Sequence, residues 1–116
     1  MERHELMLWK LAIADDAYIT ALVAHDSENL AASRLDHRTH GLVRIGALIA
    51  IDAPAASYLS AVESARDCGI SDDEVVGCLV ATLPTLGAAR VVSAAPKLGL
   101  ALGYDVGAAL EARSAD

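Results

Sequence analysis

Apolar residues recur at helical spacing through most of the chain, and no segment alternates between apolar and polar positions as a strand does. In the N-terminal part, Leu6, Trp9 and Ile13 predict a helix within residues 2–14. Two further short elements are expected there: a helix capped by Asp15 and Asp16, and a third helix or a loop over residues 27–34. The pattern predicts an all-α fold.

The middle of the chain carries two clearer helical patterns. Asp36 is a suitable N-cap for a helix whose apolar face is formed by Leu42, Ile45, Leu48 and Ile49. The segment Asp52-Ala53-Pro54 ends that helix and begins another, because proline is well tolerated at the first helical position. This next helix ends at Cys68-Gly69, where glycine suits a left-handed C-terminal residue.

The strongest local signal is the start of the following helix. Ser71 and Glu74 have the spacing of a capping box, and Ile70 and Val75 can pack around it as a hydrophobic staple. We expect this helix to reach about Leu83, where Pro84 kinks or ends it. The remaining predicted elements are a kinked helix over residues 85–102, ended by Gly103, and a short helix after Asp105 that reaches Leu110 and frays from Arg113.

The length of 116 residues predicts one domain, with N-terminal helices in residues 1–34, a helical core in residues 35–103 and a tail in residues 104–116. Hydrophobic residues make up 54% of the chain, and its mean hydropathy is +0.38. A small domain has too much surface to hide that much apolar material by itself. We therefore expect burial between identical subunits.

The net charge of the chain limits which classes of binding partner are expected. The net charge is −7 and the isoelectric point is about 4.9, which argues against a nucleic-acid or an anionic membrane partner. The N-terminus lacks the basic start of a secretory signal, and no apolar stretch predicts a membrane span. Cys68 and Cys78 are therefore expected to be free thiols in the cytoplasm.

The residues from Leu35 to Gly103 resemble the carboxymuconolactone decarboxylase and AhpD-like alkylhydroperoxidase family. The resemblance rests on Leu35-Asp36-His37-Arg38-Thr39, the apolar run Leu42–Ile51, the segment Ala65–Val76, and Gly87 with the two alanines that follow it. The family implies a compact, oligomeric helical bundle, with homotrimers or homohexamers whose active sites lie near subunit contacts. The expected partner is therefore a second copy of the chain, and no cofactor is expected.

The usual catalytic residues of that family are replaced. Its peroxidase branch has a Cys-x-x-Cys pair followed by a histidine, and these positions are Pro54, Ser57 and Ala61 here. The acidic residue expected near Gly41 or Leu42 is also missing. In the decarboxylase branch, the resemblance implies a catalytic histidine at the position that is Ala61 in this chain. Alanine has no titratable group. Neither the peroxidase mechanism nor the decarboxylase mechanism of the family can therefore be assigned to the matching residues of this chain.

Other side chains can take over proton transfer. His37 and His40 are the candidate acid or base, since histidine changes protonation near neutral pH and the two residues can share a helix face. Arg44, one turn after His40, can bind a carboxylate of the substrate. A zinc site that adds His25 or Asp36 to the two histidines is possible, but His-x-x-His is too weak a pattern to predict a metal.

Three more candidates come from elsewhere in the chain. Tyr58 and Ser57 lie at the place of the family's site, where Tyr58 can donate a hydrogen bond to a developing enolate; a core tyrosine is the plainer alternative. Arg90, inside an apolar helix, needs an acidic partner, which is either an intersubunit carboxylate or a substrate carboxylate.

The sequence thus supports three hypotheses. The first is a cofactor-free, carboxymuconolactone-decarboxylase-like protein that acts on a small organic acid or lactone in a proton-transfer lyase or isomerase step. The second is a non-catalytic ligand-binding or assembly protein of the same fold. The third is an AhpD-like thiol oxidoreductase that uses Cys68 and Cys78.

Overall fold

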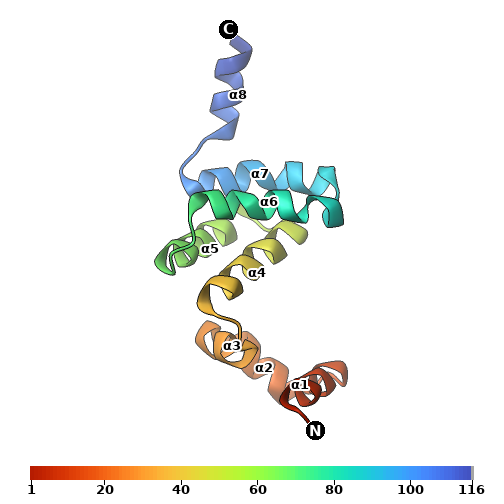
Figure 1. The fold of residues 1–116 in the computed structure, drawn as a ribbon. Coiled ribbons are helices and arrows are strands. Elements are labelled where there is room, and N and C mark those ends of the chain that lie inside the picture. The colour runs from red at the N-terminus through yellow and green to blue at the C-terminus, as the bar shows by residue number, and fades with distance from the viewer. Residues whose placement is uncertain (116) are drawn as a thin grey trace. The chain divides into compact units, whose positions relative to one another are not determined.

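The computed structural model describes residues 1–115, and all regular secondary structure within them is helical (Figure 1). The all-α prediction is therefore confirmed. The chain divides into two compact units, Met1–Asp36 and His37–Asp116. Their boundary lies two residues from the predicted end of the N-terminal helices.

The N-terminal unit consists of α1 (Arg3–Ala12), α2 (Asp16–Ala24) and α3 (Asp26–Ser33), so the segment that was open between helix and loop is helical. The Asp15 side chain caps α2 by accepting a hydrogen bond from the Tyr18 backbone N–H at 3.0 Å. Arg3 donates to the carbonyl of Ala32, which joins α1 to α3. None of the three helices has a fully buried residue.

The second unit contains α4 (His37–Ala50), α5 (Ala55–Asp67), α6 (Asp72–Leu86), α7 (Ala88–Leu102) and α8 (Val106–Ala115). Helix α4 packs against α5, α6 and α7, and α7 also packs against α5 and α6 (Figure 1). Helix α8 packs only against α7 among the described elements. Four helices, α4 to α7, therefore enclose the core of this unit.

That core is aliphatic, with one aromatic residue. Its large, fully buried side chains are Tyr58, Ile45, Ile49, Leu98, Val62 and Val75. Alanines fill the remaining positions where helices approach closely, at Ala53, Ala61, Ala65, Ala94 and Ala101. The predicted apolar face of α4 thus points inward.

The junction between α5 and α6 follows the sequence prediction closely. Gly69 has φ +81°, so it takes the left-handed conformation after α5. The Ser71 hydroxyl accepts from the Glu74 backbone N–H at 3.1 Å, and Glu74 Oε1 accepts from the Ser71 N–H at 3.2 Å. Ile70 and Val75 are both buried in the core. The predicted capping box is therefore confirmed, and its staple residues are in place.

Four predicted helix boundaries differ from those of the structure. Pro54 is the N-cap of α5 rather than its first helical residue. Helix α6 passes through Pro84 to Leu86, because a proline near the end of a helix removes one hydrogen bond without preventing the final turn. Gly87, with φ +86°, separates α6 from α7, which begins at Ala88 rather than Thr85. Helix α8 also extends past Leu110 to Ala115.

Candidate functional site

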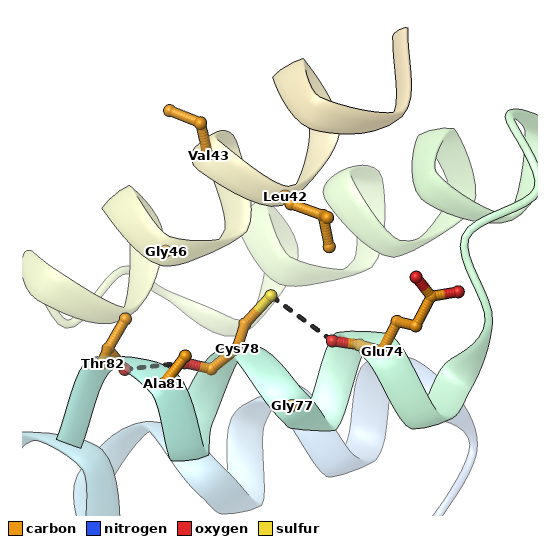
Figure 2. A pocket seen from close by; sticks show the side chains of 8 residues that line it. All are labelled: Leu42, Val43, Gly46, Glu74, Gly77, Cys78, Ala81 and Thr82. Carbon is orange, nitrogen blue, oxygen red and sulfur yellow. Dashed lines mark hydrogen bonds between the residues drawn. The ribbon is translucent and has the colours of Figure 1, made fainter. Parts of the chain in front are cut away.

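A groove between α4 and α6 is the clearest candidate site. It is open to solvent, has a volume of about 430 Å³ and is lined by Leu42, Val43, Gly46, Glu74, Gly77, Cys78, Ala81 and Thr82. Figure 2 shows Leu42 and Val43 on α4 and, across from them, Cys78, Ala81 and Thr82 on α6. The volume falls within the range of small-molecule pockets.

Small residues create this space. A β-carbon added to Gly46 would lie 3.8 Å from the Thr82 methyl, and one added to Gly77 would have no neighbour within 4 Å. Ala81 is the third small residue on the lining. The groove exists because the facing stretches of α4 and α6 carry little side-chain volume between them.

The polar atoms of the groove are largely engaged within the protein. The Cys78 thiol donates to the Glu74 backbone carbonyl at 3.5 Å, and the Thr82 hydroxyl donates to the Cys78 carbonyl at 2.8 Å (Figure 2). The Glu74 carboxylate accepts from the Ser71 N–H and pairs with Arg38. Among the lining residues that the structure describes, Glu74 is the one charged side chain.

Burial controls the chemistry of the groove's thiol. Partial burial raises the pKa of the Cys78 thiol above its ordinary value. A thiol whose pKa is raised carries less thiolate at neutral pH and is a poorer nucleophile. Cys68 is half-buried and donates to the Ala65 carbonyl at 3.3 Å, and both cysteines are free. This arrangement gives no support to the thiol oxidoreductase hypothesis.

Three predicted site residues lie on α4. His37 is the first residue of that helix and is exposed, and its backbone carbonyl lies 3.9 Å from the Cys68 sulfur. His40 and Arg44 are half-buried, one helical turn apart. None of the three belongs to the lining of the α4–α6 groove. Their catalytic and binding roles stay predictions.

Tyr58 lies inside the core. Its side chain is 0% exposed, and its hydroxyl donates to the Leu48 carbonyl at 3.0 Å. Burial raises the pKa of this phenol, and the negative charge of Asp52 raises it further. Its neighbour Ser57 is half-buried in the first turn of α5. Tyr58 thus has the geometry of a structural core tyrosine rather than that of a hydrogen-bond donor to a developing enolate.

Arg90 has an acidic partner within the same chain. Its Nη1 lies 3.8 Å from Asp52 Oδ2, and the Lys97 ammonium lies 2.8 Å from Asp52 Oδ1. Ser93 donates to both carboxylate oxygens. Hydrogen bonding from Lys97 is the main reason that the pKa of Asp52 is lowered. This ion pair lies within one chain, so it matches neither of the roles expected for Arg90, which were pairing with a carboxylate of another subunit and binding a substrate carboxylate.

Sequence reasoning overlooked Asp52, Ser93 and Lys97 as a group. A signal was present, because Arg90, Ser93 and Lys97 are spaced i, i+3, i+7 and so share one face of α7. A small cleft of about 180 Å³ lies beside Lys97. Its other lining residues are Ala55, Ala56, Leu59, Leu100 and Ala101.

Within residues 1–115, no three His, Cys, Asp or Glu side chains are grouped so that they could hold a metal ion. No helix of this part of the chain has the length and apolar character needed to cross a membrane.

No protein-family model matches the chain, and neither a curated protein nor a solved structure is significantly similar to it.

Proposed function

We propose that this protein is a carboxymuconolactone-decarboxylase-like subunit of a homo-oligomer, and that its α4–α6 groove binds a small neutral organic molecule such as a lactone. The observation that carries the proposal is the groove of about 430 Å³ with its mainly aliphatic and small-residue lining. Pockets of this size and character are typical of small-molecule sites. The resemblance to the family is the basis for expecting self-association.

The charge of the groove favours a neutral ligand over an organic acid. Glu74 lines it, and no lysine, arginine or histidine belongs to the described lining. A carboxylate that entered would lose hydration without gaining a cationic partner, which is costly in an apolar environment. The lactone class of the original hypothesis therefore fits this groove better than the organic acid class.

The same geometry favours binding over catalysis. The Tyr58 hydroxyl is held by the Leu48 carbonyl, and the candidate base residues His37 and His40 lie outside the groove lining. The one carboxylate of the lining, that of Glu74, is already engaged by the Ser71 N–H and by Arg38. Proton transfer needs a titratable group within hydrogen-bond reach of the ligand. The non-catalytic ligand-binding alternative is accordingly the function we favour over a lyase or isomerase step.

The test compares a six-membered lactone with its ring-opened hydroxy acid by saturation-transfer NMR. Ala81→Leu fills the groove, whereas Ala47→Leu adds the same volume at an exposed position of α4 outside the lining. We expect transfer to the lactone in wild type and Ala47→Leu, and its loss in Ala81→Leu. The hydroxy acid is expected to give no signal, because nothing in the lining offsets its charge.

Two outcomes would contradict the proposal. Equal lactone binding by Ala81→Leu and wild type would remove the groove as the site. A preference for the hydroxy acid would contradict the proposal of a neutral ligand. It would favour Arg44 or Arg90 as the residue that binds the ligand's carboxylate. In that case a bell-shaped rate profile with pH, lost in His37→Gln or His40→Gln, would support the catalytic alternative.

A further inference from the structure

An ion pair lies at one end of the α4–α6 groove. The Arg38 guanidinium, on α4, pairs with the Glu74 carboxylate, on α6. Arg38 precedes Leu42 by four residues and Glu74 precedes Cys78 by four, so each shares a helix face with a lining residue. Figure 2 shows the Glu74 carboxylate at the end of the lining opposite Thr82. The ion pair therefore connects the two helices where the groove ends.

The Glu74 carboxylate is held in place independently of Arg38. Its Oε1 accepts from the Ser71 N–H at 3.2 Å and from the Ser71 hydroxyl at 3.0 Å. The same hydroxyl accepts from the Glu74 N–H at 3.1 Å. Arg38 pairs with the other oxygen, Oε2. Removal of the guanidinium would therefore leave the carboxylate at the groove but without its cationic partner.

This pair determines the charge that a ligand meets. Glu74 is the one charged side chain of the described lining, and the remaining lining is mainly apolar. While it is paired with Arg38, the carboxylate contributes no net charge. Unpaired, it would attract a cation more strongly than it does in bulk water, because its side chain is only 33% exposed. An ammonium ligand must therefore displace a guanidinium that belongs to the same chain.

We infer that Arg38 is a specificity-determining residue of the α4–α6 groove: by pairing with Glu74 it excludes ammonium ligands and leaves the groove to neutral molecules. This inference rests on the proposed binding of a neutral ligand and names the residue that selects for it. Specificity often depends on such an element, which acts against the wrong ligand. The carboxylate that caps α6 thus also sets the charge of the groove.

The chain contains a matched ion pair outside the groove. Arg66 donates to both carboxylate oxygens of Asp72, at 3.1 Å each. Asp72 also lies in the first turn of α6, but neither Arg66 nor Asp72 belongs to the groove lining. Removing either Arg38 or Arg66 takes one positive charge from the chain. The Arg66 pair therefore controls for a general increase in negative charge.

The experiment uses two probes of the same ring size. Piperidine is protonated at neutral pH, and the six-membered lactone is its neutral counterpart. Dissociation constants for both are measured by NMR titration at pH 7 with wild type, Arg38→Met and Arg66→Met. Methionine keeps much of the aliphatic part of each arginine. Two double variants combine Arg38→Met with Glu74→Gln and with Ala81→Leu.

The variants are expected to fold, since the Arg38 side chain is 47% exposed. Circular dichroism checks each of them. Arg38→Gln removes the same charge with a polar side chain, and it takes the place of Arg38→Met in every comparison if the methionine variant unfolds.

We expect Arg38→Met to bind piperidine about tenfold more tightly than wild type, because the Glu74 carboxylate is then available to the ammonium. Added salt should weaken this binding, since partly exposed charges are screened. Arg66→Met should bind piperidine as wild type does. The gain should disappear when Glu74→Gln or Ala81→Leu is added to Arg38→Met.

Several results would overturn the role of Arg38. One is equal piperidine affinity in wild type and Arg38→Met, and another is an equal gain in Arg66→Met. A gain that survives Glu74→Gln shows that the ammonium does not bind this carboxylate. A gain that survives Ala81→Leu shows that the amine binds outside the groove.

The two proposals fail in different ways. Absence of lactone binding by wild type overturns the proposed function, whereas the piperidine titrations still show whether Arg38 controls the charge of the groove. Lactone binding that is lost in Ala81→Leu, together with unchanged piperidine affinity in Arg38→Met, leaves the proposed function intact and overturns the inference about Arg38 alone.

Discussion

The hydroxyl of Tyr58 donates to the backbone carbonyl of Leu48 at 3.0 Å, which ties α5 to the end of α4 inside the core. The same carbonyl accepts from the Ala53 N–H, also at 3.0 Å. One oxygen thus closes the turn between the two helices and holds the phenol. This hydrogen bond satisfies the buried phenol of Tyr58 within the protein, so its burial needs no ligand to explain it.

Replacing Tyr58 by Phe tests this structural role. The change removes one hydrogen bond while the Leu48 carbonyl keeps its bond to Ala53, so we expect a loss of about 1 kcal/mol of unfolding free energy. Urea unfolding followed by circular dichroism measures it. Ligand binding in the α4–α6 groove should be unchanged. Lost binding with unaltered stability would return Tyr58 to the functional site.

The pKa of Asp52 predicts how stability changes with pH. Hydrogen bonding from Lys97 is the largest of the causes that lower this pKa in the folded chain. A carboxylate with a depressed pKa stabilises the fold above its unfolded pKa of about 3.9, and this contribution disappears as pH falls through the lower folded value. The thermal midpoint should therefore fall as the pH is lowered below about 4.

Lys97→Met provides the control for that effect. It removes the main partner of Asp52 while keeping the aliphatic part of the side chain. The difference in midpoint between wild type and Lys97→Met should be present at pH 7 and shrink as the pH falls below about 4, because protonation of Asp52 removes its ion pair with Lys97. A difference that is constant over this range would show that Lys97 acts by packing alone. Asp72, whose pKa is lowered by Arg66, contributes to the acid slope of both proteins alike.

The raised pKa of Cys78 predicts slow alkylation. Because burial disfavours its thiolate, iodoacetamide should modify Cys78 more slowly than a small free thiol at pH 8, and the rate should rise as the pH increases. Mass spectrometry of the Cys68→Ser variant isolates this reaction. Filling the groove with Ala81→Leu should slow it further. Alkylation of Cys78 as fast as that of a free thiol at neutral pH would revive the redox hypothesis.

The capping box predicts a stability effect at Ser71. Its hydroxyl accepts from the Glu74 N–H at 3.1 Å, so Ser71→Ala should cost about 1 kcal/mol of unfolding free energy. Ser64→Ala, at an exposed position of α5, is the matched control and should change stability little. Equal effects of the two substitutions would mean that the box does not stabilise α6.

Local interactions made much of the fold predictable. The capping box at Ser71, the glycine at position 69 and the apolar face of α4 depend on residues within one or two helical turns. Their geometry therefore follows from spacing alone. The boundaries near Pro84 and Gly87 were less predictable, because a proline in the last turn costs too little to end a helix that packs against α4 and α7.

Most of the candidate site could not be predicted from the sequence. By itself, the sequence determined the helical class, the acidic charge and the uncharged stretch over residues 75–89. Only the tertiary structure decided that Gly46 faces Thr82 and that Lys97 and Arg90 meet Asp52. The physical reason is that helical periodicity fixes which residues share a face, whereas the packing of distant helices decides what each face meets.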